Sequence, residues 1–419
     1  MREIDVAVIG GGSAGLAAAA AAYEAGCTNI LILEREPMLG GILQQCIHNG
    51  FGLHVFKEEL TGPEYAQRYI DRVKQLGIPY LTYTMVLEIG RDRVLTAMNP
   101  RDGLIKIKAK AIVMATGCRE RPRGALNMAG ARAAGIYTAG TAQKLLNQTG
   151  YMPGTRVVVL GSGDIGLIMA RRFTLQGAKV EAVAEIRPYA GGLARNVAQC
   201  LEDFDIPLYL SHTVTEIKGN KRVEGVTIAQ VDENYKPKKE TERYIPCDTL
   251  LLSVGLIPEN ELARGLGIEL SSKTKGAVVN EQFETSADGI FECGNALHVH
   301  DLVDNVTLES EKAGRYAAGY VLGIKKGKAS AEVADGEGVF GTVPQRIYTD
   351  AVFEPITLMF RPSESRKNVD ICVYADGKKI ASARRLIVVP GEMAEIKLKP
   401  EVIPGEAKTI TVTLEGGEK

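Results

Sequence analysis

Two stretches of the chain repeat one order of apolar and polar positions. Each starts with a short apolar run, passes through a glycine-rich turn into a longer segment, and ends in a second apolar run followed by a glutamate. Short apolar runs bounded by glycine are typical of buried parallel strands, and the longer segments have the length of helices. The pattern predicts strand, helix and strand at residues 4–9, 13–25 and 30–33, and again at 156–160, 164–176 and 179–184.

Both turns have the spacing of a dinucleotide-binding fingerprint. They read Gly10-Gly11-Gly12-Ser13-Ala14-Gly15 and Gly161-Ser162-Gly163-Asp164-Ile165-Gly166. In such a turn the first glycine permits the bend, the second lets the backbone approach a pyrophosphate, and the third lets the helix pack on the strand. Glu34 and Glu185 each stand nineteen positions after the last glycine, where a carboxylate can bind ribose hydroxyls. The alternative, a tight turn without a ligand, is disfavoured because all the parts follow in order.

Further patterns place the second unit inside the first. Residues 80–114 alternate as short strands, and 111–117 form an apolar strand that ends in a small-residue turn. A strand-rich meander at 214–245 leads into 249–255, and a helix at 306–322 has Asp304 and Asn305 available as caps. The fold class is therefore α/β, with two Rossmann-like dinucleotide-binding domains, the second inserted in the first. We expect the first domain at 1–120 and 256–325 and the second at 121–255.

The C-terminal part changes character. Residues 369–375, an Asp376-Gly377 turn and residues 378–386 predict a hairpin, and residues 410–414 alternate with period two. We expect residues 331–419 to form a small antiparallel β domain resembling a sandwich, which serves packing or subunit contact.

Composition argues against a nucleic-acid partner, a disulfide framework and a membrane-spanning segment. The 419 residues are 45% hydrophobic and 24% charged with a net charge of -1, so a nucleic-acid partner is not expected. Seven cysteines are scattered and odd in number, which favours reduced thiols over a disulfide framework. With no apolar run long enough to cross a bilayer and no signal-peptide pattern, the expected location is the cytoplasm.

The ordered motifs resemble the pyridine nucleotide-disulphide oxidoreductases and thioredoxin reductase. They are the two fingerprints with their glutamates, Leu39-Gly40-Gly41, Ala115-Thr116-Gly117, Val254-Gly255-Leu256-Ile257-Pro258 and Gly289-Ile290-Phe291-Glu292-Cys293-Gly294-Asn295. The resemblance implies FAD in the first domain and NAD(P)H in the second. The FAD residues it implies are Gly10, Gly12, Ser13, Ala14, Gly15, Glu34, Arg35, Gly41, Met85, Val86, Ala115, Thr116, Gly117, Gly294, Asn295, Val306 and Thr307. The nicotinamide-nucleotide residues it implies are Gly161, Gly163, Asp164, Ile165, Gly166 and Glu185.

Three details of these sites lead to further expectations. Asn295 stands where the family usually has an aspartate against the ribityl chain, so a charge is lost there. Helix amides near Val306 and Thr307 are expected to stabilise negative charge on the reduced flavin. Glu185 favours NADH, whereas Arg187 leaves NADPH as the less favoured alternative.

A closer resemblance points to a partner protein. Residues 115–122 with 136–143 are similar to flavoprotein subunits of opine oxidases, hydrogen cyanide synthase and dye-linked proline dehydrogenases. Residues 40–52 and 293–301 look most like the oxidoreductase that accompanies anaerobic glycerol-3-phosphate dehydrogenase. The resemblance implies hydride exchange between NADH and FAD, electron passage to or from a dehydrogenase subunit, and an oligomer. No catalytic side chain is assigned.

The chain departs from the disulfide reductases in its cysteines. Cys46 stands alone after Gly41, and no cysteine lies between Cys118 and Cys200, so a dithiol shuttle is not expected. Two alternatives stay open: a self-sufficient NADH oxidase or peroxidase that uses Cys46, and a non-catalytic subunit that binds FAD and an adenine nucleotide structurally.

Two pairs of histidines lie near the expected flavin. His48 and His54 flank a loop in which an imidazole can exchange protons, although an ordinary polar loop fits better. His298, His300 and Asp301 could suggest a metal, but the two histidines lack a third ligand at a recognisable spacing, so we expect no metal. The segment is expected either beside the flavin or in a plain loop.

Overall fold

The computed structural model describes residues 1–324, 327, 330–350 and 354–418. It divides into two compact units, Met1–Cys118 with Pro258–Lys419, and Arg119–Ile257. In this division the C-terminal β part belongs to the first unit. The boundaries expected from the sequence therefore stay a prediction, and two of their ends, residues 325 and 419, lie outside the described residues.

The first unit contains a seven-stranded sheet in the order β5-β2-β1-β8-β7-β6, with β20 also paired to β8. Its strands are β1 (Arg2–Ile9), β2 (Ile30–Leu33), β5 (Tyr80–Leu81), β6 (Met85–Ile89), β7 (Val94–Asn99), β8 (Gly103–Met114) and β20 (Ile290–Glu292). Strand β1 is parallel to β2 and β8, and β20 is parallel to β8. Their carboxyl ends therefore meet at one edge of the sheet, where parallel α/β folds bind ligands.

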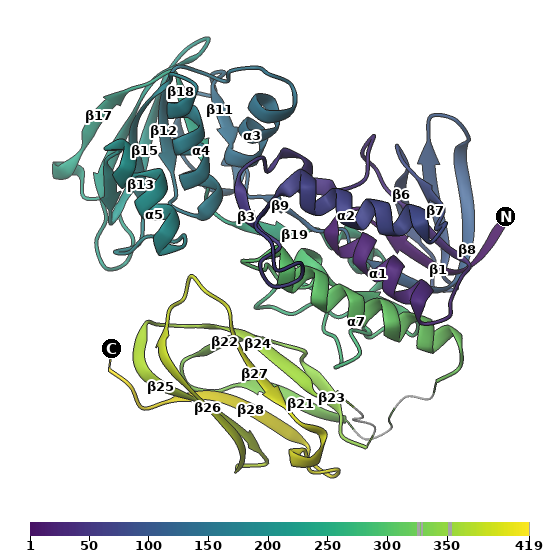
Figure 1. Ribbon diagram of the computed structural model, residues 1–419. Helices are drawn as coiled ribbons and strands as arrows, with labels where there is room; N and C mark the ends of the chain where they lie inside the picture. The colour runs from purple at the N-terminus through teal and green to yellow at the C-terminus, as the bar shows by residue number, and fades with distance from the viewer. Residues whose placement is uncertain (325–326, 328–329, 351–353, 419) are drawn as a thin grey trace. The chain divides into compact units, whose positions relative to one another are not determined.

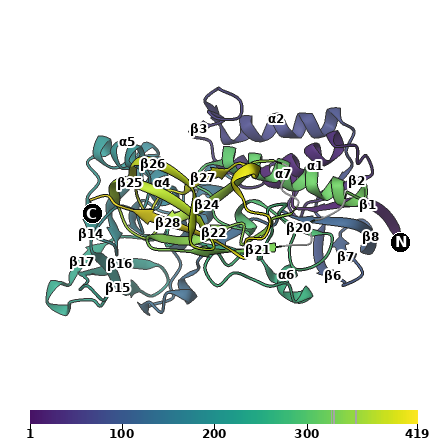
Figure 2. The ribbon, with the colours of Figure 1, turned by 90° about the horizontal axis from the view of Figure 1, so that it is seen from below.

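Three main helices of this unit are α1 (Ser13–Glu24), α2 (Gly62–Gln75) and α7 (Val303–Val321). Figures 1 and 2 both show α1 and α7 side by side. The backbones of α1 and α7 approach closely, since a Cβ added to Gly314 of α7 would lie 2.1 Å from the carbonyl oxygen of Ala18 in α1. The alanine-rich sequence of α1 permits this approach. Small residues at this contact thus fix α7 against α1.

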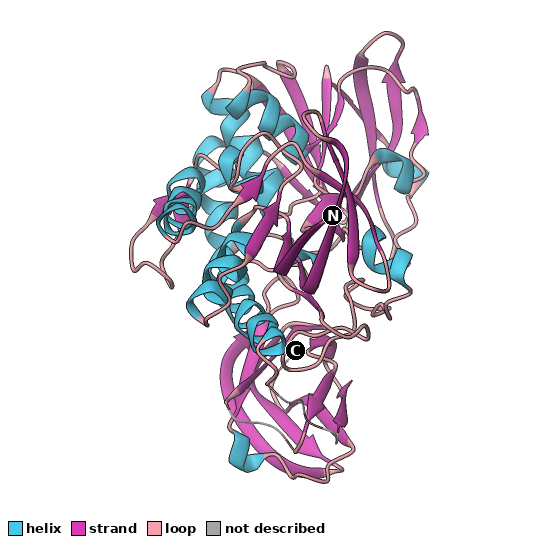
Figure 3. Cartoon of the chain, turned by 90° about the vertical axis from the view of Figure 1, so that its right-hand side faces the viewer, coloured by secondary structure: helices cyan, strands magenta, loops and turns pink. Residues whose placement is uncertain are grey.

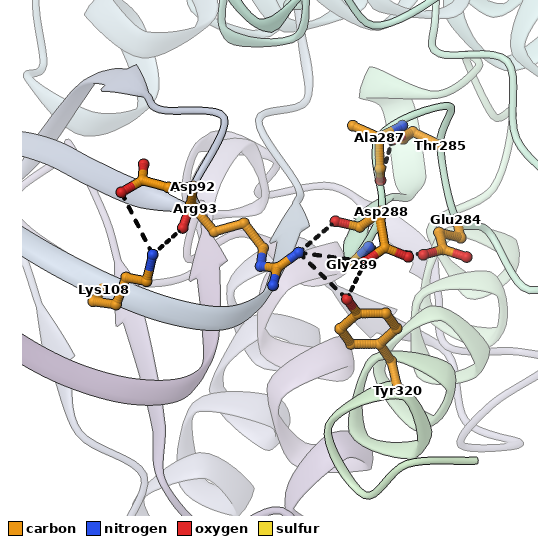
Figure 4. A network of polar contacts seen from close by, with 9 residues as sticks. All are labelled: Asp92, Arg93, Lys108, Glu284, Thr285, Ala287, Asp288, Gly289 and Tyr320. Carbon is orange, nitrogen blue, oxygen red and sulfur yellow. Dashed lines mark hydrogen bonds and ion pairs between the residues drawn. The ribbon is translucent and has the colours of Figure 1, made fainter. Parts of the chain in front are cut away.

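A polar network near the C-terminal end of α7 holds the helix to the seven-stranded sheet (Figure 4). Arg93, in the turn between β6 and β7, donates to the carbonyl oxygen of Asp288 at 2.9 Å and to the Tyr320 hydroxyl at 3.3 Å. Tyr320, near the end of α7, donates to the Asp288 carboxylate just before β20. The network joins α7, β20 and the β6-β7 turn.

The second unit repeats the Rossmann pattern. Its five-stranded parallel sheet consists of β11 (Ile136–Thr138), β18 (Thr249–Leu252), β12 (Arg156–Leu160), β13 (Lys179–Glu185) and β14 (Leu208–Leu210), in that order. Its helices are α3 (Ala139–Gln148), α4 (Asp164–Leu175) and α5 (Ala194–Cys200). The expected meander forms a second sheet of β10 (Ala129–Gly130), β15 (His212–Gly219), β16 (Val223–Gln230) and β17 (Arg243–Pro246). The expectation of two Rossmann-like sheets is confirmed.

The C-terminal part is built almost entirely of strands (Figure 3). One sheet contains β23 (Arg346–Tyr348), β21 (Ser330–Asp335), β28 (Thr409–Glu415), β25 (Arg366–Ala375) and β26 (Lys378–Val388). The other contains β22 (Val339–Val343), β24 (Ile356–Pro362) and β27 (Ala394–Leu398). Side chains of both sheets share one apolar core, as in a sandwich. The expected hairpin is present, and the strands pair antiparallel except that β21 pairs with β28 in parallel, which the sequence analysis did not predict.

Short elements complete the described chain. They are β3 (Asn49–Phe51), β4 (Leu60–Thr61), β9 (Cys118–Glu120), β19 (Leu256–Pro258) and α6 (Glu261–Leu266). Among the described residues, no helix is both long and apolar enough to span a membrane.

Candidate functional site

The first fingerprint lies at the carboxyl edge of the seven-stranded sheet. The N–H of Gly10 donates to Leu33 at 2.8 Å, and the N–H of Ala115 donates to Ile9 at 2.9 Å. These two bonds hold the ends of β1, β2 and β8 together. The structure thus brings the fingerprint, the strand that ends before Glu34 and the Ala115-Thr116-Gly117 turn to one place.

Glu34 is buried, and both of its carboxylate oxygens accept hydrogen bonds. Oε2 accepts from the N–H of Gly11 at 2.6 Å, and Oε1 accepts from the N–H of Glu36 at 2.7 Å. The N–H of Thr84 donates to the Glu34 carbonyl at 2.8 Å, which sets the start of β6 beside it. In β6, Val86 is buried and Met85 is exposed. The adenosine-side residues expected from the sequence are therefore neighbours.

The glycines of this turn divide into packing positions and an open position. A Cβ on Gly15 would lie 1.8 Å from the carbonyl oxygen of Gly10, and one on Gly10 would lie 2.3 Å from that of Ala115. A Cβ on Gly12 would instead meet only the Cα of Gly41, at 3.8 Å. Two bare backbones face each other across Gly12 and Gly41, which fits a pyrophosphate that must approach the main chain closely.

The N-terminus of α1 lies within the first fingerprint. Its N-cap is Gly12 and has no side-chain cap bond among the described residues, whereas Thr61 and Glu64 form a full capping box on α2. The first N–H groups of a helix have no intrahelical partner, and phosphates bind there. Ser13 and Ala14 are the first two residues of α1, so their N–H groups belong to this free set. This donor set fits the FAD that the sequence predicts.

Glu259 joins three of the expected FAD residues. Its carboxylate pairs with Arg35 at 2.8 Å, its carbonyl accepts from the Thr116 hydroxyl at 2.8 Å, and its N–H donates to Gly117 at 2.9 Å. Sequence reasoning missed Glu259 because it lies far from the other three in the chain.

Gly294 and Asn295 lie against the start of α1. A Cβ on Gly294 would lie 2.8 Å from the Cβ of Ala14 and 3.3 Å from a methyl of Val306. The Asn295 amide donates to Cys118 Sγ at 3.6 Å and accepts from the His300 N–H at 3.0 Å. The N-terminal turns of α1 and α7 thus meet at Gly294.

The start of α7 differs from the sequence-based expectation. The helix begins at Val303, three residues early, and neither Asp304 nor Asn305 caps it. The buried Asp304 carboxylate instead accepts from the N–H groups of Gly52 at 3.1 Å and Val55 at 2.8 Å. Thr307 lies in the second turn, and its hydroxyl accepts from Tyr65 at 2.8 Å. The open amides of α7 therefore precede Val306 and Thr307.

The second fingerprint has the same arrangement as the first. Glu185 Oε2 accepts from the N–H of Ser162 at 2.9 Å, and Oε1 accepts from the N–H of Arg187 at 2.9 Å. A Cβ on Gly161 would lie 2.0 Å from the carbonyl oxygen of Ser253, and one on Gly166 would lie 2.7 Å from its Cβ. The more open Gly163 is the N-cap of α4 and has no side-chain cap bond within the described part of the chain.

Asp164 and Ile165 begin α4. Asp164 Oδ1 accepts from the N–H of Leu193 at 2.8 Å and from the amide of Asn196 at 2.6 Å, which fixes the loop before α5. Ile165 is partly buried against the core.

Cys46 is not activated as a nucleophile. Burial raises the pKa of the Cys46 thiol to about 12, so it is protonated at neutral pH. The His48 ring lies 5.0 Å from that of Phe51, and His54 is exposed.

A buried cluster at the start of α7 includes a residue that sequence reasoning missed. His298 Nε2 bonds Glu309 Oε2 at 2.6 Å, and His300 Nε2 lies 3.3 Å from Glu309 Oε1, which also accepts from the Gly294 N–H at 2.7 Å. Burial alone would raise the pKa of Glu309, but the two histidines outweigh it and lower the pKa. Asp301, in the same loop, pairs with Arg361 and accepts from the Met393 N–H at 2.7 Å. No local spacing links Glu309 to the histidines, because it comes from the helix.

Comparison with known proteins identifies relatives. The chain is 24% identical to a subunit of the opine oxidase of Agrobacterium tumefaciens over 70% of the chain, and it spans 61% of that protein's length. It is 24% identical to hydrogen cyanide synthase subunit HcnB of Pseudomonas aeruginosa, over 78% of the chain and 73% of that protein. Thioredoxin reductase of T. acidophilum has the same fold, with a TM-score of 0.61 and 23% identity over 76% of this chain and 98% of that one.

A family model matches most of the chain. The pyridine nucleotide-disulphide oxidoreductase model covers residues 4–314, which include both fingerprints and the start of α7. The chain therefore belongs to the pyridine nucleotide-disulphide oxidoreductase family, a family of flavin- and pyridine-nucleotide-dependent oxidoreductases.

Proposed function

We propose that the chain exchanges a hydride between NADH and FAD and passes electrons to or from a partner dehydrogenase subunit. The observation that carries this proposal is the duplicated site. Glu34 and Glu185 bond their own fingerprint turns in the same way, and the N-caps of α1 and α4 are glycines, which make no side-chain cap bond. Two equivalent anion-binding helix ends call for two dinucleotides.

The first site is assigned to FAD, which when bound supplies the isoalloxazine that accepts or returns a hydride. Gly12 and Gly41 provide the bare backbone for its pyrophosphate, Glu34 orients the ribose, and Gly294 and Asn295 lie between α1 and α7. With FAD bound, the first-turn amides of α7 would stabilise the negative charge of the reduced flavin. The remaining expected contacts, Arg35, Met85, Val86, Ala115, Thr116 and Gly117, belong to this assignment.

The second site is assigned to NADH. Glu185 favours a free ribose hydroxyl because a carboxylate repels a 2′-phosphate. Gly161, Gly163 and Gly166 shape the turn, and the amides of Asp164 and Ile165 open the helix. NADPH remains the alternative because Arg187 follows Glu185 closely.

The names of two relatives and the chemistry of the Cys46 thiol both favour a partner subunit. Two relatives are named as subunits, of opine oxidase and of hydrogen cyanide synthase. Cys46 has no second cysteine nearby in the sequence, and burial raises its pKa to about 12, which disfavours a Cys46-based oxidase or peroxidase. The resemblance of residues 40–52 and 293–301 makes a glycerol-3-phosphate dehydrogenase the first partner to test.

Anaerobic titration of the purified protein with NADH tests the hydride exchange. A yellow preparation whose visible flavin band bleaches with one equivalent of NADH supports the proposal. A protein that binds FAD but is reduced by neither NADH nor NADPH is the structural subunit instead, and one that cannot be reconstituted with FAD refutes the first site.

Purification from the native source tests the partner. The proposal expects a dehydrogenase subunit to co-purify, and expects oxygen turnover of the isolated chain to be slow. Rapid NADH oxidation by oxygen or peroxide without another subunit would contradict it.

A further inference from the structure

Two histidines and one glutamate converge inside the first unit. His298 and His300 belong to the loop before α7, and Glu309 lies on α7 itself. One ligand atom from each lies within 4.8 Å of the other two, and all three residues are buried. The proposed hydride exchange assigns none of them a role.

Both imidazoles direct the same atom at one carboxylate. His298 Nε2 lies 2.6 Å from Glu309 Oε2, and His300 Nε2 lies 3.3 Å from Oε1. The ring centroids are 4.2 Å apart. Three donors therefore surround one point, with the loop on one side and the helix on the other.

His300 is the independent sign of a missing ligand. Its side chain is 0% exposed, yet neither ring nitrogen makes a hydrogen bond within the part of the chain that the structure describes, and Nε2 only approaches Glu309 Oε1 at 3.3 Å. Buried polar atoms are nearly always bonded, and an unbonded one costs about 1–3 kcal/mol. An ion at Nε2 would remove part of this cost.

We propose that His298, His300 and Glu309 bind a divalent transition-metal ion of the Zn²⁺ class. Two imidazoles and one carboxylate are donors that Zn²⁺ accepts, whereas Ca²⁺ and Mg²⁺ prefer oxygen ligands. A divalent ion also neutralises the buried Glu309 carboxylate.

Binding requires a small rearrangement. The His298 to Glu309 contact is a hydrogen bond, so the proton on His298 Nε2 must leave that atom before a metal can occupy it. Ligands then sit about 2.0–2.2 Å from the ion. The ion would fasten the loop of His298 and His300 to α7, beside Gly294, whose N–H already bonds Glu309 at 2.7 Å.

Metal analysis of the purified full chain tests the site. We expect about one equivalent of zinc, or of another divalent transition metal, by inductively coupled plasma mass spectrometry. After treatment with a chelator, calorimetric titration with Zn²⁺ should restore one equivalent. His300→Ala should weaken this binding by at least about tenfold. Because His300 makes no side-chain hydrogen bond in the described structure, this variant should still fold.

Two further variants sharpen the result. Glu309→Gln should also lose the ion, and His212→Ala, in the second unit, should bind zinc as the unaltered protein does. A protein that is isolated without metal and takes up no Zn²⁺ at micromolar concentration would overturn the proposal, leaving a proton between His298 and Glu309. Unchanged Zn²⁺ affinity in His300→Ala would overturn it too. These outcomes are independent of flavin bleaching by NADH, so the two proposals fail separately.

Discussion

The carboxylate of Glu34 accepts a hydrogen bond from the N–H of Gly11 at 2.6 Å, and the second unit repeats this relationship. There Glu185 accepts from the N–H of Ser162 at 2.9 Å. In each copy the other oxygen accepts from the backbone two residues further on, at Glu36 and Arg187. Each glutamate is thus fixed in orientation at the rim of its turn, as a ribose-binding carboxylate must be.

Gly12→Ala should weaken FAD binding without unfolding the chain. Gly12 has an ordinary φ of -77°, and a Cβ there would meet only Gly41, at 3.8 Å. The methyl group would occupy the side from which a pyrophosphate approaches. We expect a loss of about 2 kcal/mol, roughly thirtyfold in affinity, measured by flavin fluorescence titration of the apoprotein.

Gly124→Ala is the matched control, because a Cβ there meets nothing within 4 Å. It should retain full flavin content. If Gly12→Ala binds FAD as tightly as Gly124→Ala does, the pyrophosphate does not lie over Gly12.

Local patterns were enough for the two Rossmann units. Strand β2 and strand β12 have the bounds that their apolar runs predict, since a buried parallel strand needs apolar side chains on both faces. The start of α7 was not predictable in this way. Asp304 resembles a cap, but tertiary bonds to Gly52 and Val55 take its carboxylate.

Distant pairings were also hidden from the sequence. Glu309 bonds His298 because α7 packs beside the loop that contains His298. Strand β21 pairs in parallel with β28, although most of the C-terminal part separates them in the sequence. A one-dimensional pattern states which residues prefer burial, but not which buried residues meet.

Arg187→Ala should sharpen the preference for NADH. Arg187 follows Glu185 by two positions, and its guanidinium lies 5.8 Å from the ring centre of Tyr189. A 2′-phosphate needs such a cation, whereas a free ribose hydroxyl does not. We expect kcat/KM for NADPH to fall at least about tenfold and that for NADH to stay within about twofold.

Arg171→Ala offers a comparison, since Arg171 lies 5.8 Å from the ring of Phe204 in the same unit. It should leave the ratio of the two kcat/KM values unchanged. Equal losses of kcat/KM for NADH and NADPH in Arg187→Ala would mean that Arg187 does not distinguish a 2′-phosphate from a free ribose hydroxyl.

Cys46→Ser should leave reduction by NADH intact. Burial raises the pKa of Cys46 to about 12, so almost no thiolate exists at pH 7 to act as a nucleophile. Stopped-flow measurement of anaerobic flavin reduction should give a rate within about twofold of the unaltered protein. Cys200→Ser, in the second unit, is the control. Loss of peroxide turnover in Cys46→Ser alone would establish the oxidase or peroxidase alternative.

Glu292→Gln should flatten the dependence of stability on pH. Glu292 is fully buried, its Oε2 accepts from the Ala277 N–H at 2.6 Å, and its Oε1 has no hydrogen-bond partner among the described residues. Burial, with a smaller contribution from Glu309, raises its pKa from 4.5 to about 8. The folded chain therefore holds this proton up to about pH 8, while the unfolded chain releases it near pH 4.5.

The stabilisation from this proton is complete below pH 4.5 and is lost as pH rises to about 8. The loss is at most about 1.4 kcal/mol per pH unit. Glutamine keeps an oxygen for Ala277 and does not titrate, so the free energy of unfolding of Glu292→Gln, relative to the unaltered chain, should increase between pH 5 and pH 8 in urea titrations. Glu202→Gln, at an exposed position, is the control variant. Parallel curves for Glu292→Gln and the unaltered chain would show that Glu292 is ionised in the folded protein.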